Sequence, residues 1–79
     1  MKLVRIKWRD ATFHSAGWKS IKESKEYEGW IVESVGFLVK ETKKEYTLAM
    51  TLDAEREETI GVFTIPKGWT TEVKELKVK

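Results

Sequence analysis

The chain has 79 residues and a net charge of +2, and it contains no cysteine and one histidine. Its length suits one domain with a thin core, because so short a chain buries only about 60% of its unfolded surface. The missing cysteines exclude a disulfide framework and a thiolate zinc site, and one histidine excludes a histidine-rich metal site. Neither Asn nor Gln occurs and 35% of the residues are charged, a composition that favours a thermophilic source.

Basic and acidic residues are segregated along the chain. Residues 1–25 hold seven basic and two acidic side chains, residues 26–58 hold four and nine, and the remainder holds four and two. Only folding could gather the basic residues into the single face that nucleic-acid binding needs. No apolar run approaches the roughly 18 residues of a membrane span, and the N-terminus lacks the apolar stretch of a signal peptide, so we expect a cytoplasmic protein without a membrane association.

The first predicted element is a strand at residues 3–8. Val4, Ile6 and Trp8 alternate with basic residues, which places the apolar side chains on one face and the charges on the other. Residues 10–17 then have the composition of a loop.

A short helix is predicted between Ser20 and Glu28. Ser20 precedes Glu23 by three residues, which is the spacing of a capping box. The pattern puts Trp18 and Ile21 on the inner side of this helix. A helix of so few residues is marginal and needs tertiary contacts.

The segment WIVESVGFLVKE, residues 30–41, is rich in β-branched and aromatic side chains and forms the next predicted strand. Its alternation slips in the middle, because Trp30 and Val32 share one parity while Val35 and Phe37 share the other. A bulge or a strong bend near Gly36 would reconcile the two halves. Small barrels need such bends to close.

Two further strands, residues 46–52 and 59–65, flank the charged hairpin loop DAEREE. The single proline, Pro66, stops the second of them, because proline cannot donate a hydrogen bond to a ladder. The segment that begins there predicts one tight turn of 3₁₀ character, with Gly68 able to take a positive φ.

Residues 70–78 follow this turn as the last short strand. Five short strands and one helical excursion indicate a single all-β domain over residues 1–79. The predicted architecture is a small five-stranded SH3-like (Sm-like) barrel with one short helix.

Several pieces of the chain together resemble a group of small, uncharacterised proteins encoded by tailed phages and prophages. These pieces are VRIKWRDA, GW, ESVGFLVKE, LAMTL and TIPKGW before VKEL, in matching order and spacing over nearly the whole chain. The pieces SVGFLV and IPKG are the most specific. The resemblance implies a phage or prophage origin and an all-β barrel, and it transfers no catalytic or binding residue. The heavy Lys and Glu content departs from the group and is consistent with a hot host.

No cluster has the features of a catalytic site. Asp10, His14 and Ser15 are close in sequence, but a hydrolytic triad needs members held by rigid elements beside an oxyanion hole, and these fall on one loop. Glu57 and Glu58 stand in a charged loop rather than in the apolar surroundings of a catalytic acid. The chain also lacks the glycine-rich phosphate-binding motifs. We therefore expect no enzymatic activity, no metal and no cofactor.

The four tryptophans are more than so thin a core can fully bury. Trp8 and Trp30 sit on strand-like faces and are expected in the core. Trp18 and Trp69 flank turns that contain glycine, and they are the candidates for a binding surface or a homo-oligomer interface, where tryptophan is enriched. We expect Trp69 to be partly exposed in an isolated subunit and covered by a partner.

Arg5, Lys7 and Arg9 of the first strand complete the candidate binding residues. With Trp18 they could form a stacking platform for single-stranded nucleic acid. The alternative is the solvated outer face of an edge strand, where lysine discourages aggregation.

The predicted function is that of a non-enzymatic phage or prophage accessory module that binds a protein partner or forms a homo-oligomer, because exposed sheet edges favour strand pairing. Two alternatives stay open. One is a small barrel that binds nucleic acid, and the other is an oligomeric sponge in which tryptophan and basic residues capture a nucleotide-like small molecule.

Overall fold

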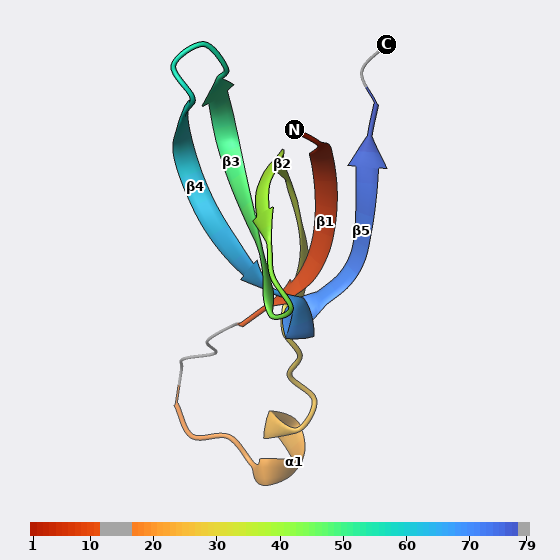
Figure 1. Cartoon of the computed structure of the whole chain (residues 1–79). Helices are drawn as coiled ribbons and strands as arrows, with labels where there is room; N and C mark the ends of the chain where they lie inside the picture. Colours follow the sequence, from red (N-terminus) through yellow and green to blue (C-terminus); the bar gives the residue numbers. More distant parts are fainter. Residues whose placement is uncertain (12–16, 78–79) are drawn as a thin grey trace.

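The computed structural model of the chain describes residues 1–11 and 17–77. Its five strands form one antiparallel sheet in the order β4-β3-β2-β1-β5 (Figure 1). The strands are β1 (Leu3–Asp10), β2 (Trp30–Glu41), β3 (Glu45–Asp53), β4 (Glu58–Pro66) and β5 (Thr70–Leu76), with the helix α1 (Ile21–Ser24) between β1 and β2 and the 3₁₀ turn η1 (Lys67–Trp69) between β4 and β5. The predicted all-β fold with five strands and one short helix is confirmed. In the described residues no ladder joins β4 to β5, so these two are the edge strands.

β2 belongs to both halves of the sheet. Its first half, up to Phe37, pairs with β1, and the rest pairs with β3. Figure 1 shows the strand bending sharply between the two halves. Gly36 stands at this bend, where a Cβ atom would lie 2.9 Å from the backbone oxygen of Ala49, so glycine allows a close approach that a larger residue would prevent. The bend expected from the slipped alternation is present, and the β2–β3 register shifts again between Leu38 and Lys40.

The core is small and lies on one face of the bent sheet. Its fully buried members come from β1, β3 and β4: Val4, Ile6, Leu48 and Ile65. Partly buried side chains pack around them: Trp8, Leu38, Tyr46 and Phe63. The period-two alternation therefore predicted the core face of β1 and β3 correctly. Among the described residues, thirteen large apolar side chains remain exposed, whereas four are buried besides Ala49, so much of the apolar surface is not covered within the subunit.

The end of the chain follows the prediction made from its single proline. β4 ends at Pro66, η1 comes next, and β5 returns antiparallel to β1. The Lys67 ammonium lies 2.6 Å from the Glu41 carboxylate and 4.9 Å from the centre of the Tyr46 ring, which ties the turn to β2 and β3. Gly68, which was free to take a positive φ, does not have one, because a right-handed 3₁₀ turn needs negative φ values.

The predicted helix exists but is shorter than expected. Ser20 caps it by accepting a hydrogen bond from the backbone N–H of Glu23 at 3.1 Å, as the capping-box spacing predicted. The helix ends at Ser24, and none of its residues is buried. The expectation that Trp18 and Ile21 face inward is wrong, since Trp18 is fully exposed and Ile21 is 76% exposed. One helical turn is too short to lay an apolar stripe against the sheet.

The subunit is elongated. Its Cα radius of gyration is 16.4 Å and its extents are 55 × 26 × 21 Å, whereas a compact domain of this length has a radius of gyration of about 11.6 Å. Figure 1 shows the cause, because residues 17–28, here called the α1 arm, extend away from the sheet at the end opposite the β3–β4 turn and both termini. Within the described part of the chain, no helix is long and apolar enough to cross a membrane.

Candidate functional site

A pocket opens where β1 is longer than β5. The β1–β5 ladder ends at the pair Trp8–Thr70, whereas β1 continues beside β2 to Asp10. The backbone beyond Trp8 therefore has no β5 residue beside it. A hollow of about 470 Å³ lies there, lined by residues 9–11, 27–29 and 68–71. This volume falls within the range of small-molecule sites.

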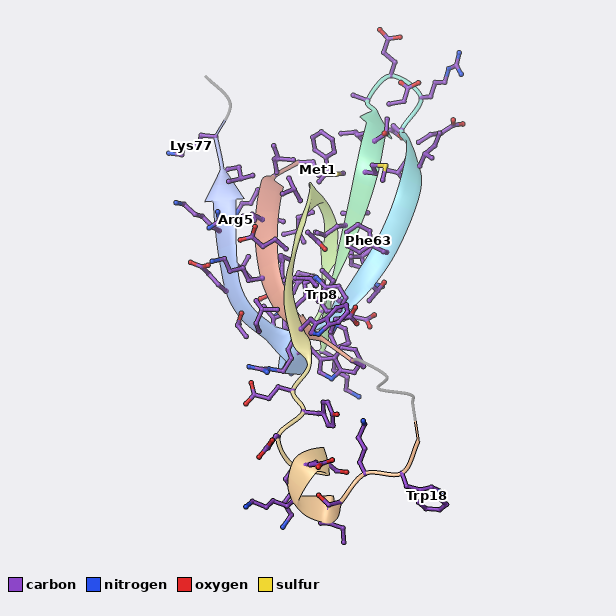
Figure 2. The ribbon with its side chains drawn as sticks, turned by 180° about the vertical axis from the view of Figure 1, so that it is seen from behind. Met1, Arg5, Trp8, Trp18, Phe63 and Lys77 are labelled. Atoms are coloured by element: carbon purple, nitrogen blue, oxygen red, sulfur yellow. The ribbon has the colours of Figure 1, made fainter. Side chains whose placement is uncertain are left out.

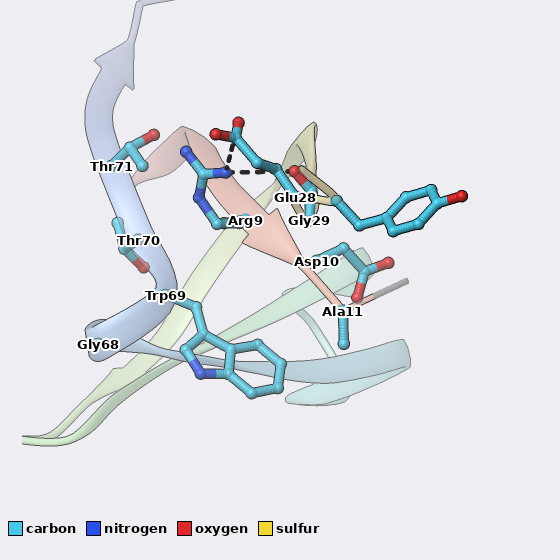
Figure 3. A pocket seen from close by; sticks show the side chains of 10 residues that line it. Arg9, Asp10, Ala11, Glu28, Gly29, Gly68, Trp69, Thr70 and Thr71 are labelled. Carbon is cyan, nitrogen blue, oxygen red and sulfur yellow. Dashed lines mark hydrogen bonds and ion pairs between the residues drawn. The ribbon is translucent and has the colours of Figure 1, made fainter. Parts of the chain in front are cut away.

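Arg9 forms one wall of the pocket (Figure 3). Its Nη1 atom donates to the carbonyl oxygen of Gly29 at 3.3 Å and lies 3.7 Å from a Glu28 carboxylate oxygen. Both contacts use the same nitrogen, so the other guanidinium nitrogens are unpaired with respect to the described residues. A guanidinium carries five N–H donors in a planar fork that suits a carboxylate or a phosphate. Arg9 therefore keeps donors for a bound anion.

Asp10 and Trp69 line other parts of the pocket. Neighbouring residues of a strand point to opposite faces, and Figure 3 shows the Asp10 carboxylate pointing away from the Arg9 guanidinium, with the indole of Trp69 lying below β1 in this view. The Asp10 carboxylate makes no hydrogen bond or ion pair with the residues that the structure describes. Trp69 is 48% exposed, as the sequence predicted. A flat aromatic surface and an available acceptor thus both line the pocket.

Gly29 and two threonines set the shape of the pocket. A Cβ atom on Gly29 would collide with the backbone oxygen of Asp10, so glycine is needed where β2 begins beside β1. The Thr70 hydroxyl donates to the carbonyl oxygen of Pro66 at 3.1 Å, and the Thr71 hydroxyl donates to a β1 carbonyl oxygen at 3.2 Å. These bonds hold η1 and the start of β5 in place, which positions the side chain of Trp69.

Arg5 and Lys7 lie outside this pocket, on the face of the sheet opposite the core. Lys7 Nζ is 3.6 Å from both Glu33 and Glu72, and Arg5 Nη2 is 3.8 Å from Glu72. The register of β1 with β2 and β5 places these acidic residues directly across from Lys7. The basic stripe suggested for nucleic acid is therefore interleaved with acidic side chains, which reduces its attraction for phosphates.

Trp8 and Trp30 have different environments although both were expected in the core. Trp8 is partly buried, and its indole N–H donates to the Ser34 hydroxyl at 3.0 Å. Trp30 is 66% exposed, so that expectation is wrong. It is the first residue of β2 and pairs with the last residue of β1, so it stands at the margin of the sheet beyond the core.

Only two of the five candidate binding residues line the pocket. Arg9 and Trp69 line the same pocket, whereas Trp18 lies on the α1 arm, far from Arg5 in Figure 2. His14 lies outside the described residues.

Several pocket residues were missed by the sequence predictions. Asp10 was considered only as part of a loop together with His14 and Ser15. Both His14 and Ser15 lie outside the described residues. Thr70 and Thr71 carry no signal of their own in the sequence. Among the pocket residues, only Gly29 carries a signal in the sequence, because a glycine directly before a strand indicates a place where another backbone segment comes close. The pocket arises from the β1–β5 pairing, which joins opposite ends of the chain.

A second surface lies on the face opposite the core. The strand register aligns one apolar residue of each strand across the sheet, and we call these residues the apolar row: Leu76, Leu3, Phe37, Ala49 and Val62. Ala49 is fully buried within the row, three members are half-buried, and Val62 is exposed, as are Val35 and Ile60 beside it. Apolar side chains gathered in this way on an exposed face can mark an interaction site.

Comparisons of the chain with known proteins identify no relative from which a role for this site could be inferred. No family model, no curated protein and no solved structure matches the chain. The phage or prophage origin implied by the sequence pattern remains a proposal, and the function is inferred from the fold and the site.

Proposed function

We propose that the protein is a non-enzymatic binding module of phage or prophage origin that associates with further copies of itself in the host cytoplasm. One observation carries this proposal, namely the surface that a single subunit leaves uncovered. Its accessible surface is 6683 Å² for a mass of 9.2 kDa, whereas a compact monomer of this mass exposes about 4,900 Å². The excess of roughly 1,750 Å² is surface that a compact fold would have buried.

This excess is large enough for a stable interface. A standard protein–protein interface covers about 800 Å² on each partner. The apolar row supplies the apolar centre that interfaces need, and the ion pairs around Arg5 and Lys7 on the same face supply a polar rim. Association would also stabilise a thin core in a protein from a hot host.

The α1 arm supports a second copy as the partner in another way. A helix of one turn without buried residues is unstable by itself. Trp18 and Ile21 on this arm are exposed, and exposed tryptophan is enriched at interfaces. A neighbouring subunit that packs against the arm would provide the tertiary contacts that its own sheet does not.

Sedimentation velocity over a concentration series tests this proposal. The wild-type chain should sediment as an oligomer, and Val62→Lys, which places a charge in the apolar row, should shift it toward the monomer. Met50→Lys is the matched control, because Met50 is exposed on the same β3–β4 hairpin but on the other face. A wild-type protein that stays monomeric throughout would refute self-association, and equal effects of both variants would exclude the apolar row as the interface.

A further inference from the structure

The pocket at the end of β1 offers three kinds of contact in one hollow. The indole of Trp69 supplies a flat apolar surface, the carboxylate of Asp10 supplies hydrogen-bond acceptors, and the guanidinium of Arg9 supplies donors with a positive charge. Arg9 and Asp10 project from opposite faces of β1 (Figure 3). Because β5 no longer covers this edge of β1, a ligand in the gap can reach both faces.

We propose that this pocket binds a nucleotide. Its planar ring stacks on Trp69, its ring or ribose N–H and O–H groups donate to Asp10, and its phosphate receives hydrogen bonds from Arg9. The proposed site lies within one subunit, so it holds whether or not the protein associates with itself.

The ion pair between Arg9 and Glu28 does not prevent phosphate binding. The two charged groups are 3.7 Å apart, and both side chains are well exposed, at 48% and 79%. An exposed pair of this kind contributes little, because water and salt screen it. A phosphate carries more charge than a carboxylate and can accept two parallel bonds from the guanidinium, including those of the nitrogens that Glu28 does not use.

Simpler ligands fit the three contacts less well. An organic cation would suit Trp69 and Asp10 through cation–π attraction and ion pairing, but Arg9 would repel it. A plain anion such as phosphate would suit Arg9 alone, and Asp10 would repel it. A ligand with a planar ring, donor groups and a separate negative charge satisfies all three residues, and a nucleotide has this combination.

Isothermal titration calorimetry with the full chain tests the proposal. The probes are AMP, GMP, CMP and UMP, together with guanosine, ribose 5-phosphate and arginine. At least one monophosphate should bind, and at least 10-fold more tightly than guanosine or ribose 5-phosphate, each of which lacks one of the contacts. In the ¹⁵N–¹H spectrum, the indole N–H signal of Trp69 should move on binding while that of Trp18 stays in place.

Variants of the three residues then locate the site. Trp69→Ala should weaken binding on the order of 5- to 100-fold, since a stacked base is lost, and Trp69→Phe should restore most of it. Arg9→Gln should weaken the monophosphate at least 10-fold and leave guanosine unchanged, whereas Asp10→Asn should weaken both. Trp18→Ala and Arg56→Gln are the matched controls outside the pocket, and they should leave affinity within about 2-fold.

Three outcomes would overturn the proposal. In the first, no mononucleotide binds at millimolar concentration. In the second, arginine binds and the nucleotides do not, which would make the pocket a cation site. In the third, recognition lies on a wider nucleic-acid surface. Either of two results would show this: a single-stranded oligonucleotide binds and the mononucleotides do not, or the control variants weaken binding as much as the pocket variants.

Discussion

The core face of the sheet and the α1 arm differ in the burial of their apolar side chains. Ile6 and Leu48 are completely buried, whereas Trp18 and Ile21 are exposed. The strands that carry these two residues, β1 and β3, have a paired neighbour on both sides, so their inner faces are covered. A single helical turn gains no such neighbour within its own subunit. The difference shows that the apolar contacts of the subunit are concentrated in the sheet, while the apolar residues of the arm stay uncovered within the subunit.

The largest effect should come from shortening a core residue. Ile6→Ala should lower the free energy of unfolding by about 2–5 kcal/mol, because it removes buried methyl groups and leaves a cavity. Ile21→Ala, the same substitution on the α1 arm, should change it by less than about 0.5 kcal/mol. Urea unfolding followed by circular dichroism measures both. Similar losses in the two variants would mean that the arm is packed in solution, contrary to its exposure here.

A methyl group at the bend of β2 should have the next largest effect. Gly36→Ala puts a Cβ atom 2.9 Å from the Ala49 oxygen and 3.2 Å from the Leu48 Cβ, and overpacking of this kind costs about 1–3 kcal/mol. Gly68→Ala is the control, since no atom lies within 4 Å of its added Cβ. The midpoint of thermal unfolding should fall only for Gly36→Ala. An unchanged midpoint would show that β2 can relax at the bend.

Trp69 stands between the two regions, since it is neither buried like the core nor fully exposed like the arm. Trp69→Ala should cost roughly 1–2 kcal/mol of folding stability, well below the about 3–5 kcal/mol expected for a buried tryptophan. The chain should remain folded, and self-association should weaken if a partner covers this side chain, as the sequence suggested. Thermal unfolding and sedimentation of the variant over a concentration series separate the two effects. A much lower melting temperature at every concentration with no change in mass would place Trp69 in the core.

The smallest effect should come from the cap of α1. Ser20→Ala removes the acceptor of the Glu23 N–H bond, and such a cap is worth about 0.5–2 kcal/mol to a helix. Since α1 buries no residue, global unfolding should change by less than about 0.3 kcal/mol. Hydrogen exchange should instead become faster in residues 21–25 alone. A clear drop in global stability would link the arm to the core.

Local patterns predicted most of the elements. The alternation of Val4, Ile6 and Trp8 gave the first strand and its inner face, and Ser20 capped a helix as its spacing indicated. Pro66 ended its strand and began a 3₁₀ turn. These features depend on a residue and its near neighbours, since side-chain period, capping and the missing proline N–H act within a few positions.

The candidate site was predicted only in part. Arg9 and Trp69 were candidates, and they do line one pocket, but Arg5, Lys7 and Trp18 lie elsewhere. The alternation of β1 places Arg5, Lys7 and Arg9 on one face. The sequence pattern could not show that the pairing with β5 stops at Trp8, which leaves Arg9 without a β5 neighbour. Asp10 was missed as a lining residue of the pocket for the same reason.

The sequence by itself determined which segments are extended, where the short helix starts and where the last strand turns back, because these follow from local backbone preferences and the period of apolar residues. The tertiary structure alone decided which apolar residues are covered and which binding candidates meet. Trp30 is exposed because it stands at the margin of the sheet, and Asp10 and Trp69 line one pocket because β1 pairs with β5 from the other end of the chain. Such pairings depend on the packing of the whole chain, and no local pattern records them.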